Sequence, residues 1–364
     1  MVHGVPVGYP HTQAGAKAAA ANYTTVRGST SFLTDTGARH RAVSVMAVDG
    51  AERAVTEKAD QDARRAATAL RGDNANLHPN QAIARTGVLS AHVLDSNSHE
   101  AMVRLWTTTV RGSAAGHATP KSAFQSVTVT LTWEGNDWKL KDTSSTSGLV
   151  APTDARQASN VTSDFSDYIA PGAADPVLSG AVEKDGFPAA YARDEHGAHA
   201  AAASAAMLYG DPRFFTDDNW RHKMLAATAA PSALEVVTSD TDSTARLVME
   251  NRGVGADGKT ADGGELVTRT AALATRSISY SDDAASVELW TASVGGVAGK
   301  DETERPQIAY LRMTVDLIWS GGTWKTTAVT PCEPLVPSPP AMQEASPVDG
   351  FVDVGGASDA PPLA

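Results

Sequence analysis

The chain repeats itself, and its tryptophans make the repeat visible. Three pairs of tryptophans are separated by 184 or 186 residues and have similar flanking sequences. They are Trp106 and Trp290, Trp133 and Trp319, and Trp138 and Trp324. Of the seven tryptophans, Trp220 alone has no counterpart, and coincidence in an alanine-rich chain does not explain three matched pairs of so rare a residue. The chain is therefore predicted to contain two copies of one unit.

Shorter motifs extend the repeat toward the start of the chain. A Gly-x-Pro-x-x-Tyr motif begins at Gly4 and again at Gly186, 182 residues later. The offset then grows to 184 and to 186, as two small loop insertions would cause. The predicted boundaries are residues 1–150 for the first unit, 151–185 for a linker with a short amphipathic segment, 186–337 for the second unit, and 338–364 for a disordered, Pro-rich acidic tail.

Length, charge and cysteine content limit what the chain can be. With 364 residues it is long enough for two ordinary domains, each with its own core. Its formal net charge of -12 argues against nucleic-acid binding, which requires clustered Lys and Arg. The single cysteine, Cys332, excludes an intrachain disulfide and a cysteine-based metal site. No run of 18 apolar residues is present, so no membrane-spanning helix is predicted.

Each unit has helical periodicity first and strand periodicity afterwards. In the first unit the predicted helices cover residues 14–27, 34–48 and 55–70, and the third has its apolar residues on one face. The predicted strands cover residues 84–95, 101–111, 123–133 and 137–143, with a short hairpin turn between the last two. Helices followed by antiparallel strands predict an α+β fold, with about three helices packed on one face of a curved four-stranded sheet.

The last two predicted strands of each unit carry a Trp-x-Gly-x-x-Trp-Lys motif, at residues 133–139 and 319–325. Three helices, a strand meander and this hairpin resemble the nuclear transport factor 2-like superfamily, with its cystatin-like cone. Two such units in tandem look like the extracytoplasmic part of conjugation-channel assembly proteins from Gram-positive mobile elements, which are similar to assembly factors of type IV secretion. The first tryptophan of each motif is expected on the helix-facing side of the sheet, and each unit is expected to unfold separately.

This resemblance implies a non-enzymatic scaffold that acts through protein–protein interaction, without cofactor or metal. Its expected partners are other protein subunits of a membrane-associated assembly, with self-association left open and no nucleic acid. It implies an extracytoplasmic location, membrane-associated or secreted, with the native N-terminal segment missing; a cytoplasmic location stays open. The alternative is a pocket protein of the same fold, which binds a small ligand or supports isomerase or dehydratase chemistry. A hollow polar cone would favour the pocket, and a filled apolar cone would favour the scaffold.

One segment, residues 253–260, fits the phosphate-loop pattern G-x-x-x-x-G-K-[ST] and includes Lys259. A functional phosphate loop follows a strand and opens a helix, whose N-terminus meets the phosphate. The residues that come next, Ala-Asp-Gly-Gly, oppose a helix. A nucleotide site is therefore not expected.

A histidine pair has the spacing of metal ligands on a helix. His196 and His199 lie three residues apart beside Glu195, as two imidazoles on a metal would. No third ligand is in register, and the first unit has no matching pair. A solvated, polar start of a helix is the favoured interpretation.

A second histidine motif, an Arg-His pair, occurs in both units, at Arg39-His40 and Arg221-His222. Each arginine is predicted to pair with a carboxylate or to bind backbone carbonyls at a domain joint. The alternative makes the histidine a general base inside the cone, although no carboxylate is placed by sequence to orient it. No catalytic, cofactor-binding or metal-binding residue is predicted.

Overall fold

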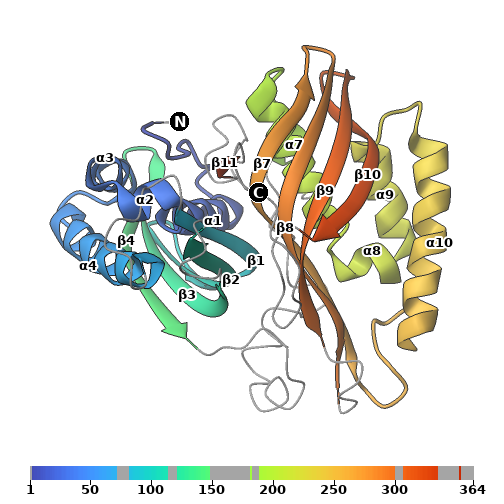
Figure 1. Cartoon of the computed structure of the whole chain (residues 1–364), viewed down its shortest axis with the longest axis horizontal. Helices are drawn as coiled ribbons and strands as arrows, with labels where there is room; N and C mark the ends of the chain where they lie inside the picture. Colours follow the sequence, from blue (N-terminus) through green and yellow to red (C-terminus); the bar gives the residue numbers. More distant parts are fainter. Residues whose placement is uncertain are drawn as a thin grey trace.

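The computed structural model shows two α+β bodies side by side, each with one antiparallel sheet and a layer of helices (Figure 1). The structure describes residues 2–71, 82–113, 121–147, 181–182, 188–299, 306–334 and 352–353. The α+β class and the antiparallel sheets agree with the prediction. The predicted linker and tail lie outside the described residues, except for two short strands, β5 (Ala181–Val182) and β11 (Val352–Asp353).

The first unit has four helices before its sheet. They are α1 (Gln13–Arg27), α2 (Thr30–Thr34), α3 (Thr36–Met46) and α4 (Glu52–Arg71). Helix α2 has no counterpart among the predicted helices, because five residues are too few to show helical periodicity. The four predicted strands are present and lie in chain order across the sheet, as β1 (Ala82–Ser96), β2 (Glu100–Ser113), β3 (Lys121–Glu134) and β4 (Asp137–Ser147).

The second unit repeats this order of elements. Its helices are α7 (Glu195–Leu208), α8 (Pro212–Thr216), α9 (Asp218–Thr228) and α10 (Leu234–Arg252). Its strands are β7 (Glu265–Tyr280), β8 (Ala284–Ala298), β9 (Gln307–Ser320) and β10 (Thr323–Pro334). Strand β11 pairs with the outer edge of β7, and β5 pairs with β6 (Pro188–Ala190). Each tryptophan pair therefore lies in equivalent strands of the two sheets.

The first helix of each unit begins in the same way. The side chain of Thr12 caps α1 by accepting from the backbone N–H of Gly15 at 3.0 Å, and Asp194 caps α7 by accepting from Gly197 at 2.7 Å. A Cβ at either glycine would lie 2.0 Å from a carbonyl oxygen of the segment that precedes the helix. Both glycines are therefore required by the tight entry into the helix.

A tryptophan pair closes one end of the helix-facing core in each unit. Trp133 on β3 is the cross-strand partner of Trp138 on β4, and their ring centroids lie 5.3 Å apart. Trp138 is buried, and its indole N–H donates to the carbonyl oxygen of Pro10 at 3.0 Å, whereas Trp133 is half-buried. Trp319 and Trp324 repeat the arrangement with centroids 5.5 Å apart. The first tryptophan of each pair packs against the helix-facing core, as predicted, and the second is the more deeply buried.

The faces of the two sheets that point away from their own helices pack on each other (Figure 1). We call this contact the joint. Two apolar clusters fill it. In one, Leu89, Trp106 and Phe124 of the first unit lie against Val267, Ala271 and Val294 of the second. In the other, Leu273, Trp290 and Tyr310 of the second unit lie against Ile83 and Val110 of the first.

The joint has pseudo-two-fold symmetry. Five pairs of repeat-equivalent residues, 184 or 186 positions apart, place one member in each cluster: Leu89 and Leu273, Trp106 and Trp290, Phe124 and Tyr310, Ile83 and Val267, and Val110 and Val294. Leu89 and Leu273 are each the extra residue of a β-bulge at equivalent places in β1 and β7, and a bulge re-aims its side chain. A Cβ at Gly87 of β1 would lie 2.9 Å from two side chains of β7, so the strands approach closely. The two units contact each other as an isologous dimer does.

Candidate functional site

The recurring Arg-His pair binds a carboxylate between helices α3 and α4 of the first unit. The buried guanidinium of Arg39 donates to Asp60 Oδ1 at 2.7 Å and to the carbonyl oxygen of Phe32 at 2.9 Å. His40 Nε2 lies 3.1 Å from both carboxylate oxygens of Asp60. Partial burial by itself raises the pKa of Asp60, but the hydrogen bonds from Arg39 and His40 outweigh it and hold that pKa below its usual value.

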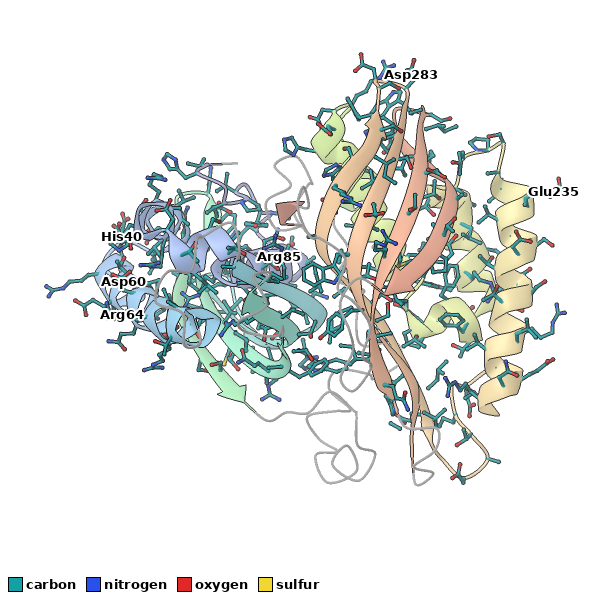
Figure 2. All side chains as sticks on the ribbon, in the orientation of Figure 1. His40, Asp60, Arg64, Arg85, Glu235 and Asp283 are labelled. Carbon is teal, nitrogen blue, oxygen red and sulfur yellow. The ribbon has the colours of Figure 1, made fainter. Side chains whose placement is uncertain are left out.

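The second unit has the same cluster between α9 and α10. Arg221 Nε donates to Asp242 Oδ1 at 2.9 Å, and His222 Nε2 lies 2.8 Å from that oxygen. The pairing of each arginine with a carboxylate fits the prediction, but its predicted place at a domain joint is wrong, because the contact lies between helices of one unit. Figure 2 shows His40 and Asp60 on the outer side of the first unit, away from the second sheet. Neither His40 nor His222 lines a cavity described below.

The glycine-rich segment at residues 253–260 connects a helix to a strand. It follows α10, and Gly253 ends that helix in the left-handed conformation with φ of 59°. Strand β7 comes next, so the strand-before and helix-after context of a phosphate loop is missing. Lys259 Nζ forms an ion pair with Glu265 at 3.1 Å. The predicted lack of a helix after the segment is confirmed.

The histidines of α7 differ from each other in their surroundings. His196 is exposed, as the predicted solvated helix start requires. His199 is buried against β7, where its Nε2 lies 2.8 Å from Ser277 Oγ and its Nδ1 lies 3.0 Å from Thr275 Oγ1. The solvated interpretation is therefore wrong for His199, because α7 packs on the sheet within its first turns. Among the residues that the structure describes, no three His, Cys, Asp or Glu side chains are placed to hold a metal.

A cavity of about 480 Å³ lies between the helices and the sheet of the first unit. Helices α1 and α4 form one side of it, and all four strands β1 to β4 contribute to the other. Most of the residues that line it have polar or charged side chains. Seven hydroxyl groups line it, from Thr24, Thr86, Thr107, Thr109, Thr143, Ser144 and Ser145. The cone of the first unit is thus hollow and polar at this end, as the pocket alternative expects, and filled at the other end by Val103, Leu131 and Trp138, as the scaffold expects.

Charged side chains of the cavity are mainly cationic. Arg27, Lys58, Arg65 and Arg111 line it together with a single acidic residue, Asp62. Arg27 Nη2 lies 3.5 Å from Asp62 Oδ2. Arg65 is at the exposed rim, whereas the side chain of Arg27 is only 13% exposed. Burial lowers the pKa of both Arg27 and Arg111 from the usual value, and Asp62 counteracts part of that effect.

The second unit does not repeat these cations. At the repeat offsets of 182 and 184, the positions of Arg27, Lys58, Arg65 and Arg111 are taken by Tyr209, Asp240, Leu247 and Gly295. A cavity of about 500 Å³ does lie in this unit, against the C-terminal turns of α10. Its lining includes Phe215, Val248 and Leu266, and its one cation among the described residues is Arg252. The cavity lined by these four cations, which we call the cationic cone, is therefore a feature of the first unit. It was not predicted from the sequence.

Comparisons with known proteins give few matches. Residues 1–164, less than half of the chain, match a family described as a domain of unknown function (DUF8175). No curated protein matches the chain. Among solved structures, the chain is similar to an "Ntf2 like protein involved in plasmid conjugation", with 8% sequence identity and a TM-score of 0.23 over 87% of this chain and 95% of that chain. No helix among the described residues is both long and apolar enough to cross a membrane.

Proposed function

We propose that the chain is a non-enzymatic assembly component, a rigid body of two units that holds other proteins of a membrane-associated machine in a fixed arrangement. The machine we have in mind is a conjugation or type IV secretion-like channel. The observation that carries the proposal is the joint between the two sheets, in which Trp106 and Trp290 are buried.

The joint supports a scaffold because it fixes the angle and distance between two outer surfaces. Sheets that pack face to face with apolar side chains cannot slide without exposing those side chains to water. The helical layers of the two units then point away from each other, at opposite sides of the body (Figure 1). Two domains that bound ligands independently would not need this rigid connection. The resemblance of two such units in tandem to conjugation-channel assembly proteins supports the choice of machine.

Deletion of the gene in the organism that carries this chain tests the proposal. Transfer of the mobile element should fall on deletion and return with the wild-type gene. Complementation with Gly87→Asp, which places a carboxylate in the apolar joint, should fail although both helical cores are retained. Gly295→Asp is the matched control, because a Cβ at Gly295 meets no atom within 4 Å. Unchanged transfer after deletion would refute the conjugation role. If the two units of the Gly87→Asp protein have separated and it still restores transfer fully, the rigid-body role is refuted.

A further inference from the structure

We propose that the cone of the first unit binds a small organic anion that also carries hydroxyl groups, with Arg27 and Arg111 holding its phosphate or carboxylate group. This binding site goes beyond the assembly role and does not depend on it. In a chain with a net charge of -12, the cavity gathers four cations around one lining carboxylate. One further acid, Asp142, lies next to it and pairs with Lys58 at 3.0 Å. An excess of two positive charges remains.

Among the described residues the two inner arginines have few hydrogen-bond acceptors, although the Arg27 guanidinium also lies 6.0 Å from the centroid of the Phe32 ring. Arg111 Nε is buried and has no hydrogen-bond partner among the described residues. Arg27 contacts Asp62 at 3.5 Å, the outer limit of a hydrogen bond. A buried guanidinium without good partners is unfavourable, and the lowered pKa of both groups has the same cause. An anion in the cavity would supply the missing acceptors, since guanidinium geometry matches carboxylate and phosphate oxygens.

The hydroxyl lining indicates what else the ligand carries. The hydroxyl groups of Thr107 and Thr109 donate to backbone carbonyl oxygens at 3.2 and 3.3 Å. Thr109 keeps a small exposed fraction, so the lone pairs of its hydroxyl oxygen are left to accept from a donor on the ligand, whereas Thr107 is fully buried. A ligand with several hydroxyl groups fits such a wall better than an apolar acid does. A cavity of about 480 Å³ has the size of a small-molecule site.

The second unit serves as an internal comparison. It has the same order of helices and strands, yet Tyr209 and Gly295 stand where the first unit has Arg27 and Arg111. The fold is thus built without these arginines in one of its two copies. Folding of the unit therefore does not require that these two arginines be buried. Binding of an anion would explain why the first unit buries them.

Calorimetric titration of the full chain tests the site with four probes: inorganic phosphate, glucose 6-phosphate, glucuronate and glucose. The two sugar anions distinguish a phosphate from a carboxylate as the charged group. At least one of them should bind saturably, with a Kd in the range of about 1 μM to 1 mM, and glucose should bind at least tenfold more weakly. Saturable binding of neither sugar anion, or equal binding of glucose, would overturn the proposal.

Variants locate the binding. Arg111→Gln and Arg27→Gln should each weaken binding of the sugar anion by roughly tenfold or more, because each removes a charge-assisted hydrogen bond. Arg64→Gln is the matched control, because it also removes one arginine charge. Arg64 is on α4, where it is exposed and points outward (Figure 2). If the inner variants fail to fold, Arg65→Gln at the rim should still weaken binding severalfold. Equal affinities of a folded Arg111→Gln protein and the wild type would place the anion elsewhere and refute the site.

Discussion

Trp106 and Trp290 occupy equivalent positions in the second strand of the two sheets, and each is buried in the joint, on the face turned away from its own helices. Trp106 lies with Val267 and Val294 of the second unit. Trp290 lies with Ile83 of the first unit. The repeated tryptophan is thus an interface residue in both copies, and the duplication has produced a dimer-like contact inside one chain.

Replacing Trp106 with alanine should weaken the joint. Truncating a buried tryptophan costs about 3–5 kcal/mol of stability. This is a large part of the free energy of unfolding of a domain, which is about 5–15 kcal/mol. The sequence alone predicts that the two units unfold separately. Because the joint buries apolar side chains of both units, we expect them to unfold together. Calorimetry should therefore show one coupled transition for the wild type and two transitions for Trp106→Ala. The equivalent Trp290→Ala should give the same separation; loss of stability without separation would contradict this role of the joint.

Adding one methyl group at Gly87 should also strain the joint. The Cβ of Gly87→Ala would lie 2.9 Å from the side chains of Ala271 and Leu273, so β1 and β7 must move apart, at a cost of about 1–3 kcal/mol. Gly295→Ala places the same methyl group in open space in a strand of the second unit. This control should be neutral or stabilising by up to about 1 kcal/mol. Urea denaturation followed by tryptophan fluorescence measures the difference, and equal midpoints would argue against a close contact at Gly87.

Local periodicity was sufficient to predict three of the four helices and the four strands of the first unit, and the repeat extends this order to the second. Period two also separates Trp106 from Val103 and Leu105 on β2, since odd and even residues of a strand face opposite sides. The sequence does not reveal what covers the second face, because the partner sheet is 184 positions away along the chain. The carboxylate of the Arg-His cluster, by contrast, could have been found: Asp60 and Asp242 lie 182 residues apart, at the offset of the arginines.

The two Arg-His-Asp clusters should make the protein sensitive to acid. The pKa of Asp60 is held low in the folded state, while that of an unfolded aspartate is about 3.9. The folded state therefore binds fewer protons near that pH, so this stabilisation is complete above about pH 4 and is lost as the pH falls below it. Asp60→Asn should lower the free energy of unfolding at pH 7 by about 1–3 kcal/mol. The decrease of this free energy between roughly pH 4 and pH 2 should also be smaller than in the wild type. Denaturation series at several pH values check this; an unchanged slope would contradict it.

Convergence of distant elements explains why the cationic cone was not predicted. Arg27 and Lys58 are on two helices, and Arg111 is on a strand that packs beneath them. Each alone has the pattern of an ordinary surface cation, because the sequence does not show which helical face meets which strand. The sequence did contain one indication of the site: these cations are absent from the second repeat. A comparison of the charged residues of the two repeats would have revealed this difference.

His199 has a hydrogen-bond arrangement that suits the neutral imidazole. Ser277 donates its hydroxyl proton to Glu195, so His199 Nε2 donates to Ser277 Oγ, and Nδ1 then accepts from the hydroxyl of Thr275. A second proton on Nδ1 would have to replace that accepted bond. Burial is the largest cause of the lowered pKa of His199; the charge of Glu195 opposes it and His196 adds to it.

Protonation of His199 should therefore destabilise the fold at mildly acidic pH. An unfolded histidine has a pKa of about 6.5, and the folded value lies below it, so the unfolded state binds more protons between the two values. Stability is then full above about pH 6.5 and falls as the pH decreases toward the folded pKa. His199→Asn should remove this part of the pH dependence. His196→Asn, on the exposed side of the same helix, is the control and should retain it. Free energies of unfolding between pH 8 and 5 measure both variants. Parallel curves for His199→Asn and the wild type would show that this imidazole does not titrate during unfolding.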